Sequence, residues 1–373
     1  MNIQLTAARV DGSVLIPADY CVYRSPGARP VADPCLPKEP TTPVMTPTRD
    51  SKPFLVQRGT ASPVPGLMGA VVAIGNFDGV HLGHRAVIGA ALERARSLGR
   101  PAAVLTFEPH PRSVLRPQQP LFRLTDERAK LRLMAATGLA GSIVLTFDAA
   151  LAEPAPEEFI RDILLRRLEV GGVAVGFDFR FGKNRTGTPD LLAAEGARGG
   201  FAVDVVPAVQ ISGRRISSGA IREQLAAGDI AGANEFLGYP WFVSGKVVHG
   251  DKRGRELGFP TANLCLDPAC ELRHGIYAVR VGLGARRYDG VASFGRRPMF
   301  DGGAVLLEVF LFDFSGDLYD AAIDVAFMDW IRPELTFPTV GELVQRMQDD
   351  VSRALAALAR VPDAFPPLGT PAG

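Results

Sequence analysis

The chain has 373 residues, which is long enough for two domains of ordinary size. Its 41 Lys and Arg residues nearly balance its 40 Asp and Glu residues, so no overall field attracts nucleic acid, and any anion site must be local. No apolar run has membrane-spanning length, and the first residues lack the charged-then-apolar order of a signal peptide. We therefore expect a cytoplasmic protein without membrane or nucleic-acid partners.

Residues 1–68 differ from the rest of the chain. Seven prolines, counting both ends, lie in the stretch from Pro26 to Pro47, and apolar periodicity is weak there. Such a segment cannot bury enough apolar surface to offset its ordering entropy. The sequence predicts a disordered extension over 1–68. An alternative is that translation starts at Met45, because the first globular-looking pattern begins near Pro53.

Residues 69–238 alternate between apolar runs and helical patterns. The expected strands are short and nearly continuous in apolar character, at 70–77, 101–107, 142–147, 173–177 and 201–206. The expected helices lie at 84–98, 125–137 and 156–169. This pattern predicts a Rossmann-like α/β domain in which a parallel sheet is covered on both faces, with ligands beyond the carboxyl ends of the strands.

Residues 239–361 have a different pattern of apolar and polar residues. Alternating runs rich in β-branched and aromatic residues occur at 241–248, 275–283, 287–294, 305–314 and 321–328, followed by one helical pattern at 340–359. This predicts a small antiparallel β-barrel with a C-terminal helix. Residues 362–373 are again rich in proline, and we expect them to form a flexible tail.

The strongest motif of the first domain runs from Gly75 to His84, between an apolar strand and a helix. Its glycines allow close backbone approach, and the first amides of the helix carry a partial positive charge, which suits a phosphate. His81 and His84 add hydrogen bonds or charge to the same anion. Nucleotidyl transfer needs this kind of positioning and charge neutralisation. The alternative is a tight turn with two surface histidines.

Three further stretches carry polar groups after expected strands. His110 lies between two prolines in a stiff loop, which a rigid connector would also explain. Residues 176–185 combine aromatic and charged side chains, and their phenylalanines could equally belong to a half-buried strand. Asp178 would be costly inside an apolar run unless it were paired or faced a ligand. Ser217 and Ser218 begin another helix with Arg222 one turn later, although a simple serine cap explains one of the serines.

These four stretches, in this order, resemble the FMN adenylyltransferase half of the bacterial bifunctional riboflavin kinase/FAD synthetase family. The resemblance implies that His81 and His84 are catalytic and contact the phosphates of ATP. It further implies nucleotide and flavin contacts from Asp178, Phe179 and Phe181. The remaining residues that we assign to ATP and phosphate binding are Gly75, Phe77, Asp78, Gly83, His110, Lys183, Ser217, Ser218 and Arg222. Gly219 stands where the family usually has threonine, so one hydroxyl is missing, which bears on the rate of adenylylation.

The second domain contains a glycine-rich basic loop followed by Pro260-Thr261-Ala262-Asn263. A phosphate loop needs glycines and nearby cations. Thr261 and Asn263 offer two oxygen ligands on one side of an extended segment, and hard oxygens suit Mg²⁺. A basic hairpin turn is the alternative. No Walker-type sequence is present, so any kinase here belongs to another class.

This stretch resembles the riboflavin kinase domain of the same family. The resemblance implies that Thr261 and Asn263 bind Mg²⁺ and ATP phosphates, and that a glutamate on a later strand is catalytic. Glu308 is the matching position, and a carboxylate there suits a base for a primary alcohol; a barrel glutamate paired with an arginine is the alternative. Arg332 is expected either to meet the flavin or to brace the C-terminal helix. Met299 replaces a usual threonine. The expected ATP-binding residues of this domain are Gly250, Lys252, Gly254, Arg255 and Pro260.

Together, these motifs predict an ATP- and Mg²⁺-dependent enzyme that converts riboflavin to FMN and then FMN to FAD with release of pyrophosphate. One rival is a riboflavin kinase whose first domain is inactive or adenylylates another phosphate. A rival of a different class is a flavin-binding sensor without turnover. Formation of FAD from FMN and ATP distinguishes the first rival, and nucleotide release distinguishes the second.

Overall fold

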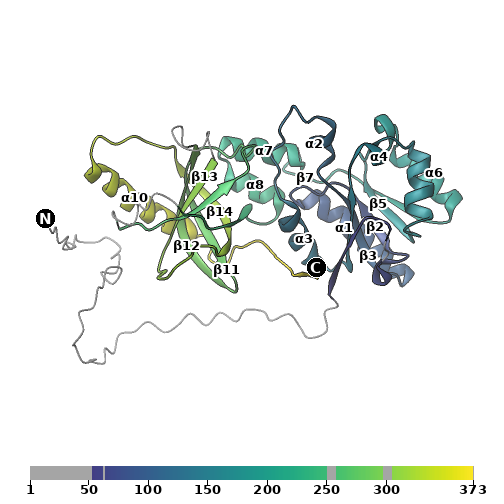
Figure 1. Ribbon diagram of the computed structural model, residues 1–373, viewed down its shortest axis with the longest axis horizontal. Helices are drawn as coiled ribbons and strands as arrows, with labels where there is room; N and C mark the ends of the chain where they lie inside the picture. The colour runs from purple at the N-terminus through teal and green to yellow at the C-terminus, as the bar shows by residue number, and fades with distance from the viewer. Residues whose placement is uncertain (1–52, 62–63, 250–257, 297–304, 373) are drawn as a thin grey trace, which may run out of the picture.

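The computed structural model describes residues 53–61, 64–249, 258–296 and 305–372. Two sheets, each with its own helices, lie side by side along the longest axis of the molecule (Figure 1). Met45, the possible translation start, lies outside the described residues, as does most of the predicted extension. Met299, which replaces a usual threonine, also lies outside them.

The first sheet has seven strands in the order β15-β1-β4-β3-β2-β5-β6. Every neighbouring pair in it is parallel. The strands are β1 (Phe54–Arg58), β2 (Val71–Ile74), β3 (Ala102–Glu108), β4 (Gly141–Thr146), β5 (Gly172–Gly176), β6 (Ala202–Val206) and β15 (Pro371–Ala372). The predicted parallel α/β domain is confirmed.

Both faces of this sheet are buried, because successive side chains of a strand point to opposite faces. In β2, Val71 and Ala73 belong to one apolar core, and Val72 and Ile74 belong to the other. The first core contains side chains of α1 (Leu82–Leu98) and α3 (Glu127–Ala135), and the second contains side chains of the π-helix η3 (Phe159–Leu165) and of α6 (Pro189–Gly199). The shorter elements of this half are η2 (Pro65–Leu67), α2 (Pro111–Leu115), α4 (Ala149–Ala152), α5 (Pro156–Glu158), η4 (Lys183–Arg185), β7 (Gln210–Ile211), β8 (Arg214–Arg215), α7 (Ser218–Ala227) and α8 (Ile230–Leu237).

The second sheet is antiparallel, with six strands in the order β10-β13-β12-β11-β14-β9. These are β9 (Phe242–Lys246), β10 (Ala262–Leu266), β11 (Gly275–Leu283), β12 (Arg286–Arg296), β13 (Val305–Leu311) and β14 (Ala322–Arg332). A bridge between Val248 and Asn263 links the two edges and nearly closes the barrel. Helix α10 (Val340–Leu358) packs on β11, β12 and β14, so the predicted barrel and its C-terminal helix are confirmed (Figure 1).

Trp241 joins the two halves of the molecule. Its indole N–H donates to the carbonyl of Leu124 at 2.9 Å, and its ring packs between Phe122 and Phe327. A bidentate ion pair between Arg132 of α3 and Asp324 of β14 lies in the same joint, with both distances 2.7 Å. One continuous apolar core therefore runs from one face of the parallel sheet into the barrel.

The structure corrects both ends of the predicted domain division. Phe54–Arg58, placed in the disordered extension, form β1 and pair with β4. Residues of the predicted flexible tail return across the molecule, where the amide of Gly369 donates to Arg132 and β15 pairs with Phe54 and Leu55 (Figure 1). The sequence shows a globular-looking pattern near Pro53 but does not by itself assign it a strand, and the tail gives no such signal because its few ordered residues lie among prolines.

Phe365 anchors this returning segment. The guanidinium of Arg287 lies 4.6 Å from the centre of its ring, and an added Cβ at Gly282 would lie 2.6 Å from that ring. Arg280, buried and paired with Asp289, also donates to the carbonyls of Val361 and Ala364 at 2.8 and 3.1 Å. The segment is therefore held by an apolar anchor and by backbone hydrogen bonds.

We expect Phe365→Ala to lower the free energy of unfolding by about 1–2 kcal/mol, because the phenyl ring is partly buried. Urea denaturation measures the change, and Thr370→Ala, at an exposed position of the same segment, is the matched control. Equal stability of the two variants would show that the Phe365 ring does not contribute to the free energy of unfolding.

Candidate active sites

The histidine turn lies between the end of β2 and the start of α1. His81 caps α1, and its Nδ1 accepts the backbone N–H of His84 at 3.2 Å. The two imidazole rings stack with their centres 3.6 Å apart, and Phe77 is tilted against His84 at 5.2 Å. Phe77 and Val80 have φ values of 52° and 39°, a left-handed conformation that costs free energy for such side chains. The turn is a strained, tightly packed support for the two histidines.

Both histidines are neutral near pH 7. Burial lowers the pKa of His81 to about 4, against the opposing effect of Asp78. Burial also lowers the pKa of His84, and the nearby His81 and Lys130 lower it further. Because Nδ1 of His81 accepts a hydrogen bond, its proton is on Nε2. The imidazoles therefore provide hydrogen bonds, and positive charge must come from elsewhere.

The start of α7 faces the same turn. Ser217 caps α7, and the hydroxyl of Ser218 donates to the carbonyl of Asp78 at 2.9 Å. Arg222, one turn later, forms a hydrogen-bonded ion pair with the buried carboxylate of Asp78. Asp78 also accepts the amides of Leu124 and Thr125 at 3.2 and 3.0 Å. Asp78 is thus an anchor that orients Arg222, and two helix starts converge on one place.

His110 belongs to this cluster as well. Its Nδ1 accepts the amide of Arg112 at 3.1 Å, and burial lowers its pKa to about 4. Charges on Asp78, Arg123, Arg222 and Lys130 all act on its pKa, so these groups lie nearby. Arg123 and Lys130 escaped the sequence analysis, because a basic residue in a loop or helix usually faces solvent.

The stretch 176–185 contributes less directly. Asp178 lies on an exposed turn and pairs with Arg215, which supplies the partner that its sequence context required. Phe181 is buried in the second core and stacks on Phe179 at 5.3 Å, but the half-buried strand alternative is wrong, because β5 ends at Gly176 and Phe177 is exposed. Lys183 is exposed and pairs with Glu153 at 2.8 Å. Within the described part of the chain, neither Lys183 nor Phe181 has a hydrogen bond, ion pair or ring contact with the histidine turn, whereas the charge of Asp178 acts on the pKa of His81.

Gly219 has room for the missing hydroxyl. An added Cβ would meet only the hydroxyl of Ser217, at 3.7 Å.

Gly219→Ala should raise the free energy of unfolding by up to about 1 kcal/mol, because glycine is a poor helix former. Gly219→Thr should adenylylate FMN roughly tenfold faster than Gly219→Ala, since a hydrogen bond to a charged phosphate adds stabilisation. Steady-state rates of the two variants measure the effect, and equal rates would show that the hydroxyl has no role.

The second candidate site is a row of polar side chains across three strands of the barrel. Asn263 of β10 lies directly opposite Glu308 of β13, and Glu308 lies opposite Ser293 of β12. Directly opposite residues share a face, with Cβ atoms about 5 Å apart. Ala262 and Leu264 point into the barrel core, so this row lies on the other face, next to the apolar cluster under α10. Ser293 was missed because only the strand register reveals it.

Asn263 has an unsatisfied oxygen. Its Oδ1 is buried without a hydrogen-bond partner among the described residues, although its Nδ2 reaches the carbonyl of Thr261 at 3.4 Å. A buried acceptor without a partner costs free energy, which a cation or a donor from a ligand would recover. The donor set of Asn263 and Thr261 therefore fits Mg²⁺. Pro260 is exposed beside them, and Gly250, Lys252, Gly254 and Arg255 lie outside the described residues.

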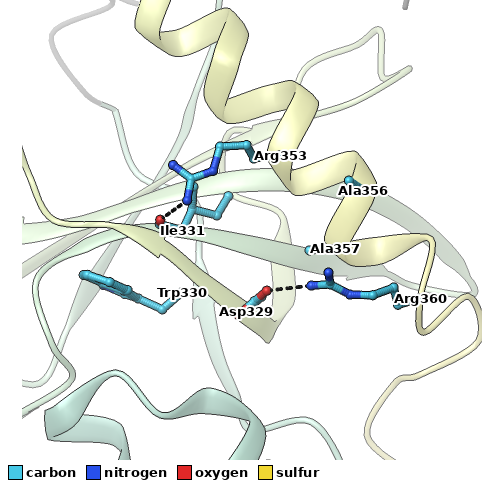
Figure 2. A pocket seen from close by; sticks show the side chains of 7 residues that line it. All are labelled: Asp329, Trp330, Ile331, Arg353, Ala356, Ala357 and Arg360. Atoms are coloured by element: carbon cyan, nitrogen blue, oxygen red, sulfur yellow. Dashed lines mark hydrogen bonds and ion pairs between the residues drawn. The ribbon is translucent and has the colours of Figure 1, made fainter.

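Arg332 occupies the bracing position. Its guanidinium is buried and pairs with Asp350 of α10 through two hydrogen bonds of 2.8 and 2.5 Å. A pocket nearby lies between β14 and α10 (Figure 2). There Arg353 donates to the carbonyl of Ile331 at 2.6 Å, and Arg360 pairs with Asp329 at 2.9 Å (Figure 2). These arginines hold α10 against the barrel, and none of the predicted site residues lines the pocket.

Two family models match the chain. The model described as FAD synthetase matches residues 65–220, and the model described as riboflavin kinase matches residues 237–358. Two relatives are named bifunctional riboflavin kinase/FMN adenylyltransferase. The protein from Haemophilus influenzae is 40% identical over 78% of this chain and 94% of its own length, and the protein from Escherichia coli K12 is 41% identical over 76% and 90%.

A solved structure titled macrolide-efflux protein from Streptococcus pneumoniae is also similar. It has a TM-score of 0.72 and 29% identity, and the alignment covers 81% of this chain and 99% of that one. Among the helices of the described residues, none is both long and apolar enough to cross a membrane. The likeness shows that the two chains share a fold over the aligned residues.

A parallel-sheet nucleotide domain joined to an antiparallel barrel, each with a polar site, defines a two-domain transferase. The chain belongs to the bifunctional riboflavin kinase/FMN adenylyltransferase family.

Proposed function

We propose that this chain phosphorylates riboflavin to FMN in the barrel and adenylylates FMN to FAD in the parallel-sheet domain. The single observation that best supports this two-site assignment is the convergence of separate motifs on two separate places. The starts of α1 and α7 meet around Asp78, and Asn263 meets Glu308 across two strands. We further assign residues 69–238 chiefly to the adenylyltransferase unit and 239–361 to the kinase unit.

In the kinase step, Glu308 accepts the proton of the riboflavin 5′-hydroxyl as that oxygen attacks the γ-phosphorus of ATP. The bond between the γ-phosphorus and the β–γ bridging oxygen breaks, and ADP leaves. Asn263 and Thr261 would hold Mg²⁺, which neutralises phosphate charge when bound. Asn263 and Glu308 are neighbours on one face, so the base and the ion-binding oxygens can serve one reacting group.

In the adenylyl transfer step, a phosphate oxygen of FMN attacks the α-phosphorus of ATP. The bond to the bridging oxygen breaks and pyrophosphate leaves. His81, His84 and His110 donate hydrogen bonds to the phosphates, and Arg222 supplies charge at the start of α7. No histidine becomes a nucleophile, because positioning and charge stabilisation suffice for this transfer. Mg²⁺ would accompany ATP here too.

The two half-reactions leave different products from ATP. Riboflavin with ATP and Mg²⁺ should release ADP, and FMN with ATP and Mg²⁺ should release pyrophosphate. Enzymatic assay of ADP and pyrophosphate measures each directly. Tight flavin binding without either product would instead identify a flavin sensor. We place the protein in the cytoplasm, where ATP is available, as a monomer or weak homo-oligomer.

A further inference from the structure

Lys130 of α3 is a buried cation next to the histidine turn. Its ammonium group pairs with the carboxylate of Glu108 at 2.6 Å and donates to the hydroxyl of Thr106 at 3.2 Å and to the carbonyl of Asn76 at 3.4 Å. An ammonium has three protons, so these three contacts satisfy it fully. Its side chain is only 2% exposed, so the ammonium group is not hydrated by bulk solvent.

These contacts join the carboxyl ends of two neighbouring strands. Asn76 follows β2 and begins the turn that carries His81 and His84. Thr106 and Glu108 end β3, immediately before the loop that carries His110. Lys130 therefore links the end of β2 to the end of β3, and each of these strand ends leads into a loop that carries a histidine of the site.

Stability alone does not account for a charge at this position. Burying an ammonium is costly, and a well-packed apolar residue in place of a buried ion pair is often neutral or stabilising. Glu108 does not depend on Lys130 for neutralisation, since Arg123 grips the same carboxylate with hydrogen bonds of 3.0 and 2.7 Å. Arg123 therefore already neutralises the Glu108 carboxylate, and the charge of Lys130 calls for a further explanation.

We propose that Lys130 is a positioning residue for adenylyl transfer, holding the ends of β2 and β3 together so that the histidine turn and the His110 loop meet one ATP molecule. This inference rests on the proposed adenylyltransferase function. The charge of Lys130 has a second effect, because it opposes protonation of His84. His81 and Lys130 are the charged or titratable neighbours that lower the pKa of His84, and Asp78, Arg222 and Asp178 act in turn on His81.

Lys130→Met tests the proposal, because methionine keeps the length and helix propensity of lysine without its charge or donors. We expect FAD formation from FMN to fall by about 10²-fold, the scale of a slight misplacement of reacting groups. Riboflavin phosphorylation by the same preparation should change by less than about twofold, because the barrel is unaltered. Arg128→Met removes an exposed cation from the same helix, and its rates should match wild type.

The pH dependence separates positioning from mere folding support. In Lys130→Met the acid limb of kcat/KM for FAD formation should move to higher pH, because His84 has lost a neighbouring positive charge. Thr106→Val is a second variant, which removes one acceptor of Lys130 and the hydrogen bond from the Thr106 hydroxyl to the carbonyl of Asn76 without changing any charge, and it should also slow FAD formation. A wild-type rate and wild-type pH profile in Lys130→Met would overturn the inference. A wild-type protein that makes no FAD would instead overturn the proposed function.

Discussion

Glu308→Gln should abolish FMN formation, with a loss of about 10²–10⁴-fold, the range for removal of a general base. Glutamine keeps the size and the cross-strand place of Glu308 beside Asn263 but cannot accept the proton of the riboflavin hydroxyl. The assay is FMN production from riboflavin, ATP and Mg²⁺ under initial-rate conditions.

The same variant carries its own control. Conversion of supplied FMN to FAD should remain close to wild type, because the histidine turn lies in the other domain. Glu271→Gln, at an exposed position of the barrel domain, should leave both activities unchanged. If Glu308→Gln reduced both activities together, the assignment of two separate sites would be wrong.

His84→Ala should slow FAD synthesis by roughly 10²-fold or more, the scale of losing one preorganised donor to a developing charge. The imidazole also stacks on His81 at 3.6 Å, so its removal takes away the ring contact that positions His81, while the hydrogen bond from the backbone N–H of residue 84 stays. Initial rates of FAD formation from FMN and ATP measure the loss.

Riboflavin phosphorylation by His84→Ala is the internal control and should stay near the wild-type rate. The thermal transition should be recorded alongside, since His84 is half-buried and packs against Phe77. A wild-type rate of FAD synthesis in this variant would move the adenylylation site elsewhere.

Local sequence patterns predicted both sheets because their periods are strong. The buried parallel strands read as short apolar runs, and the barrel strands read as alternating runs. They failed for β1 and β15, where five and two residues pair only because distant segments meet. The predicted helix over 156–169 begins as expected at Pro156, but continues as a π-helix over Phe159–Leu165, which periodicity does not distinguish.

Only those residues of the candidate sites that belong to a local sequence motif were predictable. The histidine turn, the start of α7 and Glu308 stand out in sequence because polar groups interrupt apolar context. Lys130 gives no such signal, because a lysine in a helix normally faces solvent. Its burial depends on how β2 and β3 end beside α3. The pairing of Asn263 with Glu308 likewise depends on strand register, which a single sequence does not reveal.

The central claim is that one chain performs two successive transfers. Chromatography of a reaction of the full chain with riboflavin, ATP and Mg²⁺ tests it most directly. FMN should accumulate first and then decline as FAD rises, with ADP and pyrophosphate both released. Absence of FMN, or FMN that never proceeds to FAD in the wild-type protein, would contradict the account.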